Sequence, residues 1–178
     1  MRLEVTLYAQ GQFWIGHVDL LPKERLSDLL NDVFVESPER RRRFLQINDV
    51  TVTGTDDRVK KRLKTTYVNK AAILIVVPHD GDSARGIGGS GDPKHLPFVQ
   101  KTPVFARLVL PGYEVSGYMH CSSGQTPWSL LEGQLWFVPL TNVKIMVPGS
   151  LSSWTDPFAA LNREQIVSFD VETLDSSS

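Results

Sequence analysis

The sequence predicts an all-β protein with short helical insertions, built as two tandem five-stranded barrels of one kind. The first observation is a strand-like segment, residues 44–52, that recurs 93 residues later as residues 137–145. The second is that the same offset lays residues 68–73 on residues 161–166. The third is an offset of 101 residues upstream, which aligns Gly11 and Gly16 with Gly112 and Gly117, and Leu29-Leu30 with Leu130-Leu131. Such self-similarity indicates an internal duplication.

Length and composition agree with two small domains. The chain has 178 residues, 41% of them apolar and 22% charged, which is an ordinary globular composition. We expect barrels at residues 1–78 and 103–173, a glycine-rich linker at residues 79–102 and a frayed tail at residues 174–178. Domains of this size have small cores, so we expect the two copies to pack together or the chain to oligomerise.

The sequence also predicts where the protein works. Its longest apolar run, residues 71–78, is too short to span a bilayer, and the first residues begin a strand pattern rather than a signal peptide. Cys121 is the only cysteine, which excludes an internal disulfide and a cysteine-based zinc site. We therefore expect a cytoplasmic protein without a membrane partner.

In the first copy, apolar alternation predicts strands at residues 3–10 and 13–21, joined by a Gly11-Gln12 turn. The period then changes, because Leu26, Leu29, Leu30 and Val33 are spaced as on one face of a helix. We expect these leucines to cover one open end of the first barrel, and Leu130-Leu131 to do so in the second. Further strands are predicted at residues 44–52, 62–68 and 73–77.

The second copy repeats this plan from residue 104 to about residue 172, with a long loop predicted at residues 149–157. Residues 86–91 in the linker match G-x-G-x-x-G literally. That fingerprint binds dinucleotides only where it follows a strand and opens a helix, and Asp92-Pro93 follows here. No nucleotide cofactor is expected.

Residues 67–78 read Tyr-Val-Asn-Lys-Ala-Ala-Ile-Leu-Ile-Val-Val-Pro, which resembles the closing motif of the Sm-like family of small barrels, the LSm and Hfq-like domains. The hairpin from Gly11 to Gly16 and the strand at residues 44–52 are similar to the first and middle strands of that family. The resemblance implies an Sm-like/SH3-like barrel in each copy, edge-to-edge homo-oligomers and RNA binding. The family's N-terminal helix is missing, residues 20–43 are inserted, and its Lys-His pair is replaced.

The replacements are Asn69-Lys70 and Asn162-Arg163, at the turn where the resemblance implies a pore. An amide followed by a cation can bind a base edge and neutralise a phosphate. The alternative is a structural turn, in which Asn caps its own backbone and the cation points to water.

A second candidate for nucleic-acid contact is the basic concentration interleaved with Phe44 and Tyr67. The alternative is a solvated flank, partly neutralised by Glu36 and Glu39. Residues 1–78 hold 13 Lys and Arg against 10 Asp and Glu, whereas residues 103–178 hold 3 against 7, so a polyanion should prefer the first copy. The cations concerned are Arg40, Arg41, Arg42, Arg43, Lys60, Lys61, Arg62 and Lys64.

No catalytic constellation emerges. His120 and Cys121 are neighbours on a predicted strand and point to opposite faces, and the histidines lack the spacing of metal ligands. We expect no enzyme, no metal and no cofactor. Two hypotheses follow: a non-enzymatic tandem Sm-like protein that binds RNA weakly as an oligomer, or a protein-interaction scaffold that uses the barrels without nucleic acid.

Overall fold

The computed structural model of the chain describes residues 1–33, 42–54, 58–80 and 101–171. It confirms the all-β class. The predicted linker falls mostly, and the tail wholly, outside the described residues, as do Arg40 and Arg41. The first half contains β1 Arg2–Ala9, β2 Gln12–Asp19, α1 Leu26–Leu30, β3 Phe44–Gly54, β4 Val59–Asn69, the 3-10 turn η2 Lys70–Ala72 and β5 Ile75–Pro78. The second contains β6 Lys101–Leu110, β7 Tyr113–Ser122, α3 Pro127–Leu131, β8 Phe137–Met146, β9 Ser153–Asn162, η3 Arg163–Gln165 and β10 Ser168–Val171.

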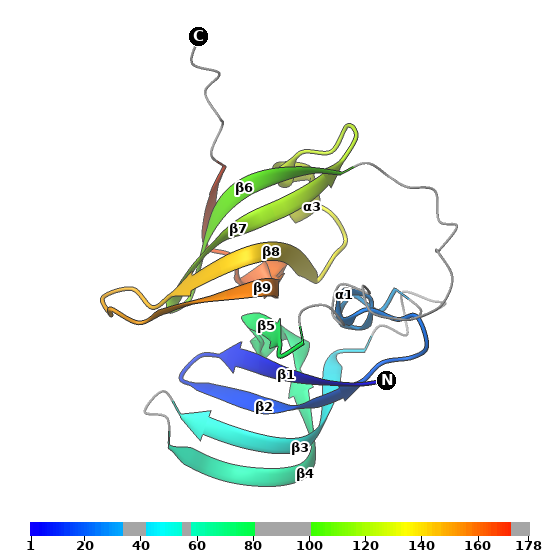
Figure 1. Cartoon of the computed structure of the whole chain (residues 1–178), viewed down its shortest axis with the longest axis vertical. Helices are drawn as coiled ribbons and strands as arrows, with labels where there is room; N and C mark the ends of the chain where they lie inside the picture. The colour runs from blue at the N-terminus through cyan, green and yellow to red at the C-terminus, as the bar shows by residue number, and fades with distance from the viewer. Residues whose placement is uncertain (34–41, 55–57, 81–100, 172–178) are drawn as a thin grey trace.

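The ten strands form one antiparallel sheet in the order β10-β6-β7-β8-β9-β5-β1-β2-β3-β4. In the described ranges neither half is closed by its own strands, so the two five-stranded units predicted from the sequence belong to one open sheet, and the two copies pack together. Instead β5 lies between β1 and β9, pairing Ile75 with Leu161 and Val76 with Ala160. Figure 1 shows the two lobes meeting along this joint. All of β5 is buried, so water cannot reach the backbone N–H and C=O groups on its outer edge. The pairing with β9 supplies hydrogen-bond partners for these groups.

Both lobes nevertheless contain the same strand order and the same local irregularities. Phe44 and Phe137 each open the third strand of their half, as predicted. Asp49 and Asn142, 93 residues apart, both have left-handed backbone, with φ of 49° and 50°. Such a residue turns the strand and lets one strand curve around a small core.

The loop predicted at residues 149–157 is shorter than expected, because β9 already begins at Ser153. Pro157 is what made this segment look like a loop. In β9 it lies opposite left-handed Asn142, at the point where the pairing of β8 with β9 is interrupted. A proline is tolerated there because it has no N–H to offer the ladder.

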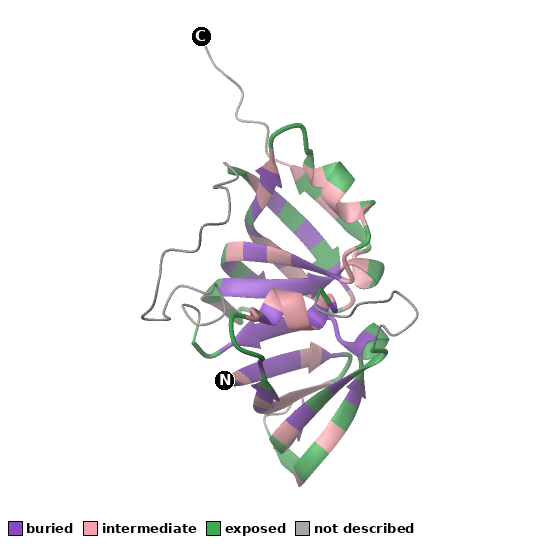
Figure 2. Ribbon diagram, turned by 90° about the vertical axis from the view of Figure 1, so that its right-hand side faces the viewer, coloured by how far each residue is buried: buried purple, intermediate pink, exposed green. Residues whose placement is uncertain are grey.

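Each lobe curves around its own apolar cluster (Figure 2). Leu26 and Leu30 on α1 are fully buried in the first cluster, and Leu29 is partly buried against it. Leu130 and Leu131 on α3 pack against the second cluster but stay partly exposed. The first cluster also takes in Phe137 and other residues of the second half, so the halves share part of their cores.

A candidate interaction face at the open edge of the first half

The two Asn-cation turns that the sequence predicted as binding sites have the same backbone design. Asn69 accepts a hydrogen bond from the amide of Ala71 at 3.0 Å, and Asn162 accepts one from the amide of Glu164 at 3.1 Å. Each asparagine thus caps a one-turn 3-10 helix, the role that short polar side chains commonly have at helix starts. Their surroundings differ, because β9 is covered by β5 whereas β4 is the outermost strand of the sheet.

Lys70 points inward. Only 1% of it is exposed, and its ammonium donates to Asp32 Oδ2 at 2.8 Å. A second hydrogen bond on Asp32 Oδ2 comes from the backbone amide of Arg42 at 3.1 Å, and the Trp136 ring lies 6.0 Å from the ammonium. Burial lowers the pKa of Lys70, while the hydrogen bond and charge of Asp32 raise it. The charge of Lys70 is therefore neutralised inside the protein.

Asn162 is an anchor between the halves. It is 1% exposed, and its side-chain amide donates to the carbonyls of Lys70 at 3.0 Å and Ile73 at 2.8 Å. A second anchor is Asn31, just after α1, which donates to the carbonyl of Phe137 and accepts from its amide, at 2.9 and 2.8 Å. These hydrogen bonds fix the second half on the first.

Arg163 is partly exposed and forms an ion pair with Glu164 next to it in the chain. Of the four residues in the two turns, Asn69 is thus the exposed one. The structure does not bring Asn69, Lys70, Asn162 and Arg163 together on one surface of the chain.

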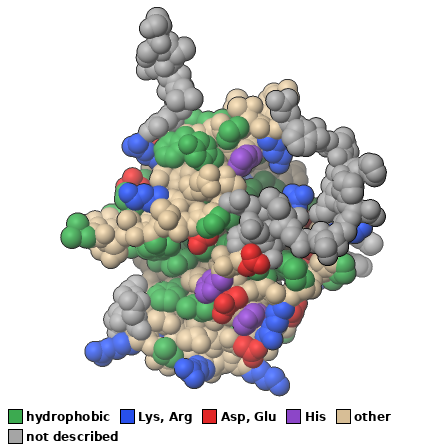
Figure 3. Space-filling view, in the orientation of Figure 1, with side chains coloured by type: hydrophobic (Ala, Val, Ile, Leu, Met, Phe, Trp, Pro, Cys, Tyr) green, Lys and Arg blue, Asp and Glu red, His purple; other side chains and the backbone are tan. Residues whose placement is uncertain are grey.

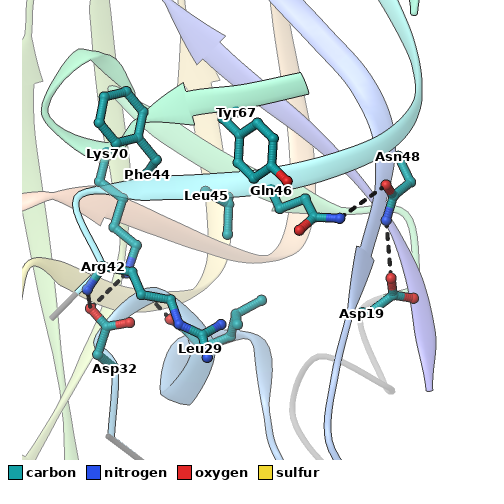
Figure 4. Close-up of a pocket in the computed structure, with 10 residues that line it drawn as sticks. All are labelled: Asp19, Leu29, Asp32, Arg42, Phe44, Leu45, Gln46, Asn48, Tyr67 and Lys70. Carbon is teal, nitrogen blue, oxygen red and sulfur yellow. Dashed lines mark hydrogen bonds and ion pairs between the residues drawn. The ribbon is translucent and has the colours of Figure 1, made fainter. Parts of the chain in front are cut away.

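The outer face of β3 and β4 carries two exposed aromatic side chains. Phe44 is 52% exposed and Tyr67 is 64% exposed. Between them Gln46 pairs with Tyr67 across the strands and bonds to Asn48, whose amide donates to Asp19 at 3.0 Å. These residues and the end of α1 line a hollow of about 350 Å³ (Figure 4). Its floor includes the Lys70–Asp32 pair.

Beyond this hollow, β4 is strongly basic. Lys60, Lys61, Arg62 and Lys64 are exposed and form no ion pair among the described residues. Lys and Arg side chains stand out along the lower rim in Figure 3, where β4 lies. Arg42 and Arg43 are also exposed, and Arg42 lines the hollow.

Three residues of this region escaped the sequence analysis: Asp32, Asn31 and Trp136. Asp32 lies in a left-handed turn after α1 with φ of 53°, a conformation that Asp tolerates better than most residues. Its distance of 38 residues from Lys70 leaves no local signal of pairing. The one available hint was an acidic residue near the end of the helix predicted over Leu26 to Val33.

Cys121 and His120, neighbours in the sequence, lie in different surroundings. Cys121 is buried, which raises the pKa of its thiol, and His120 bonds Thr141 at 2.7 Å. Over the described ranges, no three His, Cys, Asp or Glu side chains gather as metal ligands would. None of the helices in the same ranges has the length and apolar character needed to cross a bilayer.

Comparison of the chain with protein-family models, with curated proteins and with solved structures gives no match.

Proposed function

We propose that the protein is a non-enzymatic binding protein whose first half holds single-stranded RNA weakly along β4. The observation that carries the proposal is the row of exposed cations at Lys60, Lys61, Arg62 and Lys64, without acidic partners in the described part of the chain. Cations spaced along one strand can follow a phosphate backbone.

The residues around the row support a single-stranded ligand. Tyr67 continues the same strand and presents an exposed ring on which a base can stack. Arg42 and Arg43 add positive charge at the neighbouring end of β3. Lys70 is not part of this proposal, because its charge is already neutralised by Asp32.

The alternative is a protein-interaction scaffold that does not bind nucleic acid. It is favoured by the acidic second half, where residues 103–178 hold 3 Lys and Arg against 7 Asp and Glu. That half repels a polyanion, so the affinity available to RNA comes from the first half alone.

The test compares Lys60→Ala/Lys61→Ala with Lys101→Ala/Lys144→Ala, which removes as many exposed cations from the second half. Fluorescence anisotropy of a labelled oligouridine is followed from low to physiological salt. If both lysines contact phosphates, the first variant lowers the slope of log affinity against log salt by about 1.4 units. The control should keep the slope of the parent chain.

Two results would decide against the proposal. One is the absence of oligouridine binding to the parent chain at low salt. The other is an equal loss of affinity in both variants, since that would reflect net charge rather than a site on β4. Either result favours the protein-interaction alternative.

A further inference from the structure

The second half carries a hollow of about 480 Å³ between α3, η3 and β10. Its volume falls within the range of about 300–1,000 Å³ that is usual for ligand sites. Apolar side chains from all three elements line it, together with two carboxylates. We infer that this hollow binds an arginine side chain from a basic segment of a partner protein.

The corresponding place in the first half is filled from within the chain. Phe137 packs there beside α1, and Asn31 bonds to both backbone groups of Phe137. Leu74, just before β5, is accordingly only 3% exposed. Its counterpart Val167, 93 residues later, is 69% exposed. In the part of the chain that the structure describes, the second half thus keeps the framework of this place without a side chain that fills it.

Glu132 is the unpaired acid of the hollow. It stands at the place of Asn31 and, unlike an amide, its carboxylate only accepts hydrogen bonds. Glu132 is exposed and forms no ion pair within the described ranges. A cation, Arg163, also lines the hollow, but it is already paired with Glu164. The carboxylate of Glu132 is therefore available to a cation from outside.

Trp128 provides an aromatic surface next to this carboxylate. It lies one helical turn before Glu132, whose amide donates to the carbonyl of Trp128 at 2.9 Å. Side chains at this spacing are neighbours on one side of a helix. The ring of Phe169 stacks on the indole, with centroids 5.8 Å apart and planes 24° apart, yet Trp128 remains 60% exposed. An open aromatic face and a free carboxylate thus lie side by side.

This combination fits a guanidinium better than an ammonium. A guanidinium is planar, stacks on aromatic rings and donates two parallel hydrogen bonds to a carboxylate. An ammonium is a more strongly hydrated point charge and has no flat face to stack. The apolar side chains of Leu131, Ile166 and Val167 can contact the methylene stem of the arginine.

The charge of the second half selects a basic partner. Residues 103–178 hold 3 Lys and Arg against 7 Asp and Glu. This field attracts a cationic segment and repels a phosphate backbone. A basic segment at α3 and RNA on β4 occupy different halves, so binding at the hollow does not depend on RNA binding.

Fluorescence anisotropy of a short labelled peptide of alternating glycine and arginine tests the site, beside the same peptide with lysine in place of arginine. Glu132→Gln removes the carboxylate with little change of shape, and Trp128→Leu removes the ring but keeps an apolar side chain. The matched control, Asp49→Asn, removes an exposed carboxylate from the first half. Asparagine fits there, because Asn142 has the same left-handed backbone at the corresponding place. Circular dichroism and thermal unfolding check that each variant is folded.

The arginine peptide should bind the parent chain at low salt, and more tightly than the lysine peptide. Glu132→Gln should weaken its binding about tenfold or more, because a hydrogen-bonded charge pair is lost. Trp128→Leu should weaken it about two- to fivefold through the loss of the aromatic face. Asp49→Asn should bind the arginine peptide as the parent chain does.

The same measurements can overturn the inference. Absence of binding to the parent chain at low salt would do so, as would equal affinities for the two peptides. Equal losses in Glu132→Gln and Asp49→Asn would mean that net charge, rather than the hollow, attracts the peptide. Analytical ultracentrifugation of the parent chain covers the remaining case: self-association that Trp128→Leu abolishes would mean that a second copy occupies the hollow.

Discussion

The ammonium of Lys70 lies 2.8 Å from a carboxylate oxygen of Asp32, and both side chains are almost completely buried. This ion pair ties the turn after β4 to the segment after α1. Lys70 also donates to the carbonyl of Leu29 at 3.5 Å, near the C-terminal end of α1. The same ammonium thus binds a helix carbonyl and neutralises the carboxylate of Asp32. The helix is thereby held over the first core, where Phe137 of the second half packs against it.

Asp32→Asn should destabilise the protein strongly. The substitution leaves the buried cation of Lys70 without a counter-charge, which typically costs about 3–5 kcal/mol. Asparagine tolerates the left-handed backbone at this position, so the loss measures the charge rather than the turn. The free energy of unfolding is obtained from urea denaturation at neutral pH.

The matched control removes both charges. Lys70→Met with Asp32→Asn keeps a similar volume and leaves no uncompensated ion, so it should recover most of the stability lost in Asp32→Asn. If the double variant is as unstable as the single one, the loss comes from packing or the turn and the electrostatic account fails.

The effect of Asp32→Asn should also depend on pH. Burial lowers the pKa of Lys70 below its ordinary value, so at intermediate alkaline pH the unfolded chain holds more protons than the folded one. The free energy of unfolding contributed by Lys70 therefore rises with pH until the ordinary pKa is passed. Asp32→Asn removes the hydrogen bond and the charge that raise the pKa of Lys70, so the lowering is larger, and the difference in free energy of unfolding from the parent chain should narrow as pH rises toward the ordinary pKa of lysine, about 10. A difference that widens as pH rises toward that value would contradict this sign.

Asn162→Ala and Asn69→Ala form a matched pair for the joint between the halves. Asn69→Ala removes one exposed cap, at a cost of about 1 kcal/mol. Asn162→Ala removes the same cap and also leaves the buried carbonyl of Ile73 without its donor, at a further cost of about 1–3 kcal/mol, whereas the carbonyl of Lys70 still accepts from the amide of Ile73. Thermal unfolding of both variants compares the two losses. If the two variants lose equal stability, the hydrogen bonds from Asn162 to the first half add nothing to the stability that the cap provides.

The close approach at Gly16 and Gly117 gives a test of the structural repeat. A methyl group at Gly16 would lie 2.8 Å from Ile47 and 2.9 Å from the carbonyl of Asn48, and one at Gly117 would lie 3.0 Å from the carbonyl of Thr141. Each Gly→Ala substitution should therefore cost about 1–3 kcal/mol in the free energy of unfolding. If one is neutral, the two halves do not share this packing.

Much of the fold could be predicted from the sequence, because strands and turns leave local patterns. Alternation located β1, β2 and β3, and the spacing of Leu26, Leu29 and Leu30 located α1. The sharing of β5 between two neighbours could not be predicted in the same way. An apolar run such as β5 is equally suited to closing its own barrel or to lying between two lobes, and the choice depends on contacts far apart in the chain.

The candidate site was harder to predict for the same reason. The two turns look alike in sequence, yet Asn69 is exposed and Asn162 is buried. The difference arises because β9, which ends at Asn162, has strands on both sides, whereas β4, which ends at Asn69, is paired only with β3. The cation of Lys70 is paired with an acid that a different element brings in. The exposed cations on β4 could be recognised from the sequence alone. Charged side chains on an edge strand stay in water, so their position does not depend on contacts with a distant part of the chain.

The edge-to-edge association that the resemblance implies can be tested at the level of single residues. If two copies pair β4 with β10 as β9 pairs with β5, the 93-residue offset places Ser168 opposite Val68 and Phe169 opposite Tyr67. Phe169 of one molecule should lie directly across from Tyr67 of the next, and directly opposed residues in neighbouring strands are close enough for a disulfide. Tyr67→Cys/Phe169→Cys should therefore form a ladder of covalent multimers after mild oxidation, seen by denaturing electrophoresis without reductant. The native Cys121 is buried, so the parent chain should form no ladder.

Tyr67→Cys/Val171→Cys is the matched control for that register. The same pairing places Val171 opposite Thr65, two residues along the strand from Tyr67, where the separation exceeds the roughly 7 Å limit between the α-carbons of a disulfide. This variant should remain uncrosslinked under the same oxidation. Equal ladders from the two variants would mean random collision. A ladder from Tyr67→Cys/Val171→Cys alone would mean that β4 and β10 meet with a register different from that of β5 and β9, so that the contact between copies does not repeat the internal joint.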